Sequence, residues 1–446
     1  MATAVAAASR SLIVPPASPA APPIRAGWTL FDPFVVTEDA AAAVTNDDTA
    51  ATCCVTRCGR DVRVSLRLAD PPSASYVVMR TDAELHGTPK VVAADGDLLL
   101  IEMAVVEPPS TVSREQNFLV YTAHPSSPSL LLLPHRDDDS YFYTGIVAGE
   151  EEEEEFVAAA FSTEITRAGD GDDEGAKEVG WLTRFSSSTG QHEVLDLPIP
   201  YDPSKGLYKL VWHTDKVFAF RGRHMCFVDY HRGILLCDVF TTNTSPELRF
   251  LPLPEIEVWD EEHDYFNGRR LPQEHRTVDV SKGGVMRFVD VSDGLFGRRR
   301  HPYAVTVTTW TLRAAAAAEV AVWEWEKDGV LQVGDLWNSC EFRRSPLPRR
   351  APLFPAVCKR DPGVVGFALM DWNSSTKDAW VIVVDVREME LLAYAPYTNQ
   401  AKEGEVHEEG YEVVAGCLFH DTPFICSDIY NYYKTFARME DAGRQQ

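Results

Sequence analysis

Residues 228–240 read VDYHRGILLCDVF and residues 246–254 read PELRFLPLP, and these two stretches decide the fold. The run at 234–237 is apolar at consecutive positions, as a short strand buried on both faces requires. Turn-forming residues follow at 241–246, and Leu248, Phe250 and Leu251 return the chain to the core. The stretch predicts two strands joined by a turn and closed by proline.

The same pattern of strand, polar turn, strand and closing proline recurs along the chain. Its other copies are 119–121 with 130–133, 181–185 with 194–197, and 380–385 with 391–395. The closing residues Pro134, Pro198 and Pro252 follow one another at intervals of about 50 to 65 residues, with further short apolar runs between them. About four strands in each interval is typical of the blades of a β-propeller.

We therefore predict an all-β, β-propeller-like fold with five to seven four-stranded blades, formed by residues 27–430. Residues 1–26 are rich in Ala, Ser and Pro and are predicted to be a disordered tail. Residues 431–446 are assigned to a C-terminal tail. The alanine-rich window 313–319 is interpreted as a loop insertion, because it has no apolar stripe.

A ring of blades must join its first and last members or leave two unpaired strand edges. Strand-like runs at 411–419 and 423–426 are expected to close the ring. Their expected partners lie between Trp28 and Met79, where 62–68 alternates and 76–79 is apolar.

Composition restricts the possible partners. With 446 residues, 45% of them hydrophobic, the chain can bury a large core. Its formal net charge of -25 argues against nucleic acid, which is bound by clustered Lys and Arg. No window has the length and apolarity of a membrane span. We expect an unidentified protein partner, and neither nucleic acid nor a membrane.

Nine cysteines, scattered without paired spacing, indicate a reducing compartment. Cys53, Cys54 and Cys58 lie close in sequence but lack zinc-ligand spacing, so we interpret them as ordinary strand thiols. We expect a cytoplasmic or nuclear location. The N-terminal 26 residues leave an organelle transit peptide as the alternative, because they contain two arginines and no acidic residue.

The motif V-D-x-x-x-G-I-L-L-C-D-V at 228–239, followed by L-P-x-P at 251–254, resembles the plant, largely grass-expanded family catalogued as domain of unknown function 1618. Residues 28–35 are similar to the start of that family, and 68–76 to its D-P-P-x-x-S-Y phrase. The resemblance extends over about 28–430 and implies no mechanism. The same motif is also similar to F-box-associated propeller domains, although no helical F-box precedes Trp28.

No catalytic, cofactor-binding or metal-binding residue is predicted, and no cofactor is expected. The motif residues are interpreted as structural; they are Asp229, Gly233, Cys237, Asp238, Pro252 and Pro254. His224 and His231 lie near Asp229 and Asp238 in sequence, which leaves acid–base chemistry or metal binding as an alternative. Asp238 is expected at the far end of its strand, and Asp229 is expected to accept backbone N–H groups or to lie beside Arg232.

We expect a non-enzymatic protein–protein interaction module or scaffold, because the sequence contains no nucleophile elbow, P-loop or zinc-protease motif. One alternative is a substrate receptor or adaptor in ubiquitin-dependent turnover. Another is a propeller enzyme acting on a sugar or small ester. A cluster of carboxylates at one end of the central channel would favour the enzyme.

Overall fold

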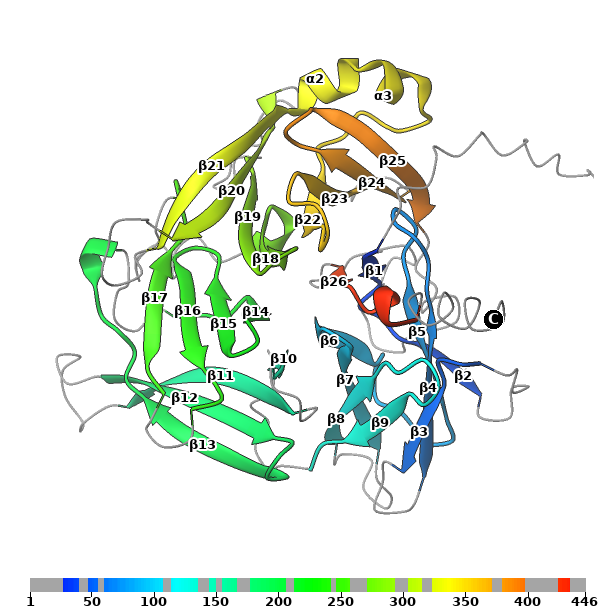
Figure 1. Cartoon of the computed structure of the whole chain (residues 1–446), viewed down its shortest axis with the longest axis vertical. Helices are drawn as coiled ribbons and strands as arrows, with labels where there is room; N and C mark the ends of the chain where they lie inside the picture. The colour runs from blue at the N-terminus through cyan, green and yellow to red at the C-terminus, as the bar shows by residue number, and fades with distance from the viewer. Residues whose placement is uncertain are drawn as a thin grey trace, which may run out of the picture.

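The structure is a computed structural model that describes residues 27–39, 47–54, 60–106, 114–134, 144–149, 155–166, 177–205, 212–241, 246–256, 271–292, 304–314, 323–370, 379–397 and 424–433. Within these residues the chain forms six blades around a central axis, as Figure 1 shows. The prediction of an all-β propeller with five to seven four-stranded blades is confirmed.

Five of the blades are antiparallel sheets of four strands taken in chain order, with the first strand nearest the axis. Blade 2 contains β6 (Lys90–Asp95), β7 (Leu98–Val106), β8 (Arg114–Thr122) and β9 (Ser129–Leu132). Blade 3 contains β10 (Thr144–Ala148), β11 (Phe156–Thr166), β12 (Lys177–Ser186) and β13 (Gln191–Leu197). Blade 4 contains β14 (Lys216–Phe220), β15 (His224–Asp229), β16 (Gly233–Asp238) and β17 (Leu248–Pro252).

The remaining two of these five blades follow in the same way. Blade 5 contains β18 (Arg276–Ser281), β19 (Val285–Val291), β20 (Thr306–Ala314) and β21 (Trp323–Gln332). Blade 6 contains β22 (Leu353–Val357), β23 (Val364–Leu369), β24 (Ala379–Asp385) and β25 (Glu390–Tyr397).

Blade 1 is built from both ends of the described chain. Its outer part is the sheet β2-β5-β4-β3, made of β2 (Val36–Asp39), β3 (Ala51–Cys54), β4 (Asp61–Arg67) and β5 (Tyr76–Thr81), with β2 parallel to β5. Its inner part is β1 (Thr29–Phe31), which pairs with β26 (Ile425–Ser427). Backbone bonds of 2.7 Å join Ser75 to both Leu30 and Asp32, so β1 also lies against the start of β5.

The C-terminal strand β26 therefore closes the ring. It contacts β6 on one side and β22 on the other, which are the inner strands of the neighbouring blades. The expectation that 423–426 pairs with the region after Trp28 is confirmed for Ile425 and Cys426, but the partner is β1, whereas 62–68 and 76–79 pair within their own sheet. The run 411–419 lies outside the described residues.

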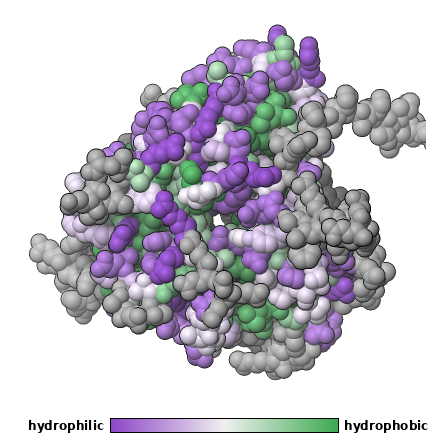
Figure 2. All heavy atoms as spheres, viewed as in Figure 1, coloured by the Kyte–Doolittle hydropathy of each residue, from purple (hydrophilic) through white to green (hydrophobic). Residues whose placement is uncertain are grey.

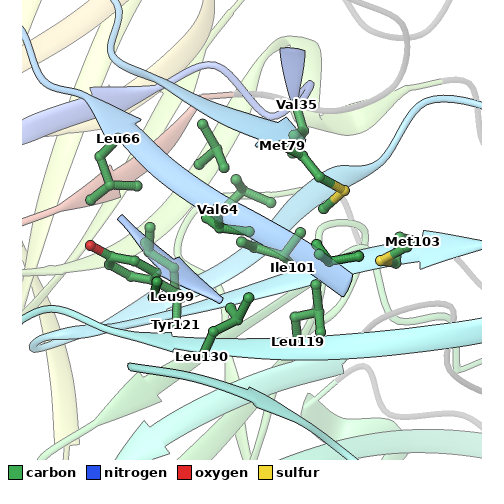
Figure 3. Close-up of a cluster of buried hydrophobic side chains, with 14 of the residues drawn as sticks. Val35, Val64, Leu66, Met79, Leu99, Ile101, Met103, Leu119, Tyr121 and Leu130 are labelled. Atoms are coloured by element: carbon green, nitrogen blue, oxygen red, sulfur yellow. The ribbon is translucent and has the colours of Figure 1, made fainter. Parts of the chain in front are cut away.

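The core is divided among the blade interfaces. The described residues contain six buried apolar clusters, one between each pair of adjacent blades. Figure 3 shows the cluster between blades 1 and 2, where Val64 and Met79 face Ile101 and Leu119. Each blade of the ring is covered on both faces by its two neighbours. Its strands can therefore have buried side chains on both faces.

The hairpin β16–β17 illustrates this packing. In β16, Leu235 and Cys237 belong to the cluster between blades 3 and 4, whereas Ile234 belongs to the cluster between blades 4 and 5. All three are fully buried. The four repeated patterns are the outer hairpins of their blades, namely β8–β9, β12–β13, β16–β17 and β24–β25.

Two short helices follow β21, α2 (Val333–Asn338) and α3 (Cys340–Arg344), and two 3-10 turns, η2 (Pro203–Lys205) and η3 (Pro272–Glu274), occur in the links between blades. Apolar residues at i, i+3 and i+4 in α2 pack into the cluster between blades 5 and 6; they are Val333, Leu336 and Trp337. These helices are not predicted from the sequence, since six and five residues are too few to establish a helical period. Of the window 313–319, the structure describes the end of β20, and the rest lies outside the described residues.

We expect Leu235→Ala to lower the free energy of unfolding by about 3 kcal/mol, because it leaves a cavity between blades 3 and 4. Urea-induced unfolding measures this loss. The matched control is Leu131→Ala, at a side chain 45% exposed on β9, which should change the stability by less than about 0.5 kcal/mol. Equal effects at the two positions would contradict the packing described for β16.

Candidate functional site

Charged side chains meet at the inner strands, and we call this group the inner-ring ionic cluster. It consists of Asp95 at the end of β6, Lys216 at the start of β14, Asp279 within β18, Lys359 just after β22 and Asp428 just after β26. Five of the six blades thus contribute one charge each. Figure 2 shows hydrophilic residues around a small opening in the middle of the molecule.

Asp279 is bonded to two lysines from two other blades. Its Oδ2 accepts from Lys216 Nζ at 2.9 Å, and its Oδ1 accepts from Lys359 Nζ at 2.6 Å. Burial alone would raise the pKa of the Asp279 carboxyl, but the two ammonium groups outweigh it and lower that pKa to about 2. Burial likewise opposes the charge of each lysine, and the carboxylate of Asp279 holds both lysine pKa values above their usual range. One ionised carboxylate therefore joins blades 4, 5 and 6.

Asp95 and Asp428 lie on the two sides of the closure between β26 and β6. Burial raises the pKa of Asp95 to about 6, although its Oδ2 accepts the backbone N–H of Ala148 at 2.9 Å. Burial also raises the pKa of Asp428. Lys359 attracts both carboxylates, but its ammonium group already bonds Asp279. In this cluster the pKa values of Asp95 and Asp428 are thus raised, whereas the pKa of Asp279 is lowered.

We expect Asp95→Asn to stabilise the protein at pH 8, by on the order of 1 to 3 kcal/mol, and to have little effect near pH 4. A raised pKa means that the folded protein binds the Asp95 proton more tightly than the unfolded chain does. The contribution of Asp95 to stability therefore falls as the pH rises from about 4 to about 6, and stays unfavourable above that.

Thermal unfolding of both proteins across this pH range measures the effect. Glu84→Gln, at an exposed carboxylate, is the control and should show no such trend. A difference between Asp95→Asn and the parent protein that does not change with pH would contradict a raised pKa at Asp95.

The motif residues form a second polar group, buried in the turn between β15 and β16. Asp229 and Arg232 are both fully buried and pair at 2.7 Å. Asp229 also accepts the backbone N–H groups of His231 at 2.9 Å and His213 at 3.1 Å. Asp229 thus both accepts backbone N–H groups and lies beside Arg232, the two contacts expected of a structural aspartate at this turn. Arg276 of blade 5 donates to the carbonyl of Tyr230 at 2.7 Å, so this turn also links two blades.

Asp238 lies at the other end of the hairpin from Asp229. Asp229 pairs with Gly233 across the β15–β16 ladder, while Asp238 pairs with His224. Asp238 binds Arg223 at 3.0 Å and accepts the backbone N–H of Phe240 at 3.1 Å. The two carboxylates of the motif therefore lie at opposite ends of the hairpin. They do not converge with His224 and His231 on a single site.

The other motif residues have packing or backbone roles. A Cβ on Gly233 would lie 2.5 Å from the carbonyl oxygen of Leu251, so no larger residue fits. Burial raises the pKa of the Cys237 thiol to about 12 and makes it a small apolar side chain. Pro252 ends β17, and its carbonyl accepts Nε1 of Trp325 from blade 5 at 2.9 Å. Pro254 lies in the turn after β17.

The inner-ring ionic cluster is not predicted from the sequence. Its residues are far apart in sequence, and each precedes, interrupts or follows a short apolar run. The one local signal is the charge within VDV at 278–280, where an aspartate occupies a strand interior. Among the described residues, no group of three or more His, Cys, Asp or Glu side chains is placed to hold a metal ion. No helix in the described part of the chain has the length and apolarity to cross a membrane.

Residues 227–366 match the model of a family described as "Protein of unknown function (DUF1618)", which supports the resemblance drawn from the motif for this part of the chain. The match begins in β15 and ends in β23, and it contains the buried Asp229–Arg232 turn. Comparison of the sequence with curated proteins finds no match.

Solved structures with some likeness include a xylan β-1,4-xylosidase from Bacillus halodurans, with 8% identity, a TM-score of 0.26 and coverage of 69% of this chain. This chain spans 56% of the length of that enzyme. A levansucrase variant from B. megaterium has 10% identity and a TM-score of 0.27, with 82% of this chain and 91% of that chain covered. A GH32 β-fructofuranosidase from Bombyx mori has 10% identity and a TM-score of 0.27, covering 70% and 59%. At such low identity and TM-score, these likenesses carry no argument about function.

Proposed function

We propose that this protein is a non-enzymatic scaffold that binds a protein partner on the surface of a closed six-bladed ring. The observation that carries this proposal is that buried charges are used to join blades. Asp279 binds lysines of two other blades, and Arg276 binds the carbonyl of Tyr230 across a blade interface. These groups join neighbouring blades from within, which leaves the faces and the rim of the ring for recognition.

The charge of the chain indicates what kind of partner to seek. A formal net charge of -25 attracts basic surfaces and repels the phosphates of nucleic acids and of anionic lipids. We therefore propose a basic protein as the partner. Five cysteines of the described residues are free thiols, which supports a cytoplasmic or nuclear site of action; they are Cys226, Cys237, Cys340, Cys358 and Cys426.

Affinity purification followed by cross-linking mass spectrometry tests the scaffold. We expect a basic protein cross-linked to one face or to the rim, and its recombinant form should bind the purified chain more weakly as salt is raised. Recovery of cullin-complex subunits would assign the adaptor role in protein turnover instead. Failure of every recovered protein to bind the purified chain directly would contradict the proposal.

One observation favours a second candidate, an enzyme that acts on a sugar or small ester. Asp95, Asp279 and Asp428 gather at the inner strands, and the pKa of Asp95 is raised while that of Asp279 is lowered. Two carboxyl groups with pKa values displaced in opposite directions are the arrangement that acid–base catalysis uses. The two lysines on Asp279 count against this role, because they occupy both of its oxygens.

The two candidates respond differently to Asp95→Asn. A scaffold should bind its partner as before, since Asp95 lies at the axis and not on the rim. A glycosidase or esterase should lose activity on aryl glycosides or aryl esters by about a hundredfold or more. Turnover of such substrates by the parent protein, abolished in the variant, would establish the enzyme and exclude the non-enzymatic scaffold.

A further inference from the structure

A third charged group lies between blades 5 and 6, away from the axis, and we call it the blade 5–6 clasp. It consists of Arg287 in β19, Thr309 and Thr311 in β20, Asp328 in β21, and Arg387 in the turn between β24 and β25. Its carboxylate is placed by a β-bulge. Thr309 pairs with Gly329 and Trp310 with Lys327, so Asp328 is the extra residue of β21.

Asp328 accepts four hydrogen bonds, three of them on one oxygen. Its Oδ1 accepts from Thr309 Oγ1 at 2.8 Å, and its Oδ2 accepts from Thr311 Oγ1 at 2.7 Å. The same Oδ2 also binds Arg387 Nη2 at 2.6 Å and Arg287 Nη1. Oδ2 therefore has no capacity left for a further strong donor, and one negative charge serves two guanidinium groups.

Arg287 is left with an unsatisfied donor. Its side chain is 1% exposed, and among the described residues its Nη2 has no hydrogen-bond partner. A buried N–H without an acceptor is costly, and a guanidinium is the donor best suited to an oxygen anion. Arg387, which is 38% exposed, connects the same place to solvent. The excess positive charge and the buried orphaned donor thus lie at one interface between blades, which Arg387 connects to solvent.

We propose that the blade 5–6 clasp binds an oxyanion, with one oxygen of a phosphate, sulfate or carboxylate group accepting from Arg287 Nη2 and Arg387 supplying the second positive charge. The ligand is a small anion or the anionic group of a larger molecule. This site is separate from the inner-ring ionic cluster and does not depend on the scaffold role. It gives a local positive site to a chain whose net charge is otherwise strongly negative.

Titration calorimetry of the full-length protein with inorganic phosphate, sulfate and acetate tests the proposal, with sodium chloride at matched ionic strength as the reference. We expect saturable binding of at least one of the three anions. Strongest binding of phosphate or sulfate would identify a tetrahedral ligand, and strongest binding of acetate a carboxylate. Arg387→Gln should weaken binding by about tenfold or more while leaving the buried Arg287–Asp328 pair in place.

Two further variants make the result decisive. Asp328→Asn removes the competing negative charge and should tighten binding several-fold. Arg313→Gln is the matched control, because Arg313 is exposed and pairs with Glu326 at 2.9 Å outside the clasp; it should change the affinity by less than about twofold. The proposal is overturned if neither the parent protein nor Asp328→Asn shows saturable anion binding. It is also overturned if Arg387→Gln and Arg313→Gln lose the same amount of anion affinity.

Discussion

Ending the chain after Asn399 is expected to produce a protein that aggregates instead of folding. The truncation removes β26, which is the inner strand of blade 1 and contacts both neighbouring blades. It also removes Phe424 and Cys426 from the cluster between blades 6 and 1, and Ile429 from the cluster between blades 1 and 2. Each buried apolar side chain contributes roughly 1.5–3 kcal/mol, so the loss is comparable to the whole stability of an ordinary domain.

Polar contacts of the same segment add to this loss. Asn431 donates to the carbonyl of Gly27 at 2.7 Å, and the hydroxyl of Tyr433 lies 2.5 Å from that of Tyr121. Tyr121 in turn donates to the carbonyl of Thr49 at 2.6 Å. The segment assigned from the sequence to a C-terminal tail at 431–446 thus begins with residues that bind the ring.

Soluble yield, light scattering and thermal unfolding measure the outcome. The matched control ends the chain after Tyr433, keeps every contact named above and should remain soluble. A peptide spanning 420–433, added during refolding, should partly rescue the fragment that ends at Asn399. If residues 27–399 instead form a soluble fragment that melts cooperatively, the ring closes without β26 and the proposed closure is wrong.

Asp279→Ala is expected to lower the free energy of unfolding by about 3 to 5 kcal/mol. The substitution leaves Lys216 and Lys359, whose side chains are each 19% exposed, as two neighbouring and largely buried cations without their shared carboxylate. An uncompensated buried charge is more costly than the loss of the ion pair itself. Repulsion between the two ammonium groups adds to the loss of stability, because like charges at short range destabilise each other.

A companion variant separates this explanation from simple loss of packing. In a background with Lys216→Met and Lys359→Met, the further change Asp279→Leu should restore most of the stability, because none of the three side chains of this contact is then charged. Urea unfolding of all these proteins gives the coupling energy. If Asp279→Ala costs less than about 1 kcal/mol, the ionic cluster is solvated and does not join the blades.

Local patterns identify the outer hairpins of four blades, because each consists of two apolar runs joined by a polar turn, with a proline at or near the end of the second run. The pair β16–β17, for example, is recognised from the apolar run at 234–237 and from Pro252. The inner strands are harder to recognise. They are as short as the three residues of β26, and their partners in neighbouring blades are far away in sequence.

The structure of blade 1 could not be deduced for the same reason. Nothing local in Thr29–Phe31 specifies a partner almost four hundred residues away, and a three-residue strand has no period to read. The inner-ring ionic cluster depends on the same long-range arrangement, since Lys216, Asp279 and Lys359 meet only after three blades have packed. The Asp229–Arg232 pair was accessible from the sequence because its partners are three residues apart in one turn.

Because blade 1 combines strands from both ends of the described chain, it can be completed only late in biosynthesis. Chains emerge from the ribosome N-terminus first, and domains usually fold as they emerge. Here β1 to β5 are made first, yet the strand that completes their blade, β26, is made after every other strand of the ring. Until it appears, the nascent chain is an open row of blades with apolar surface exposed at both ends. A substitution that slows the docking of β26 should therefore make folding of the new chain more dependent on chaperones. This holds even where the substitution leaves the finished ring as stable as before.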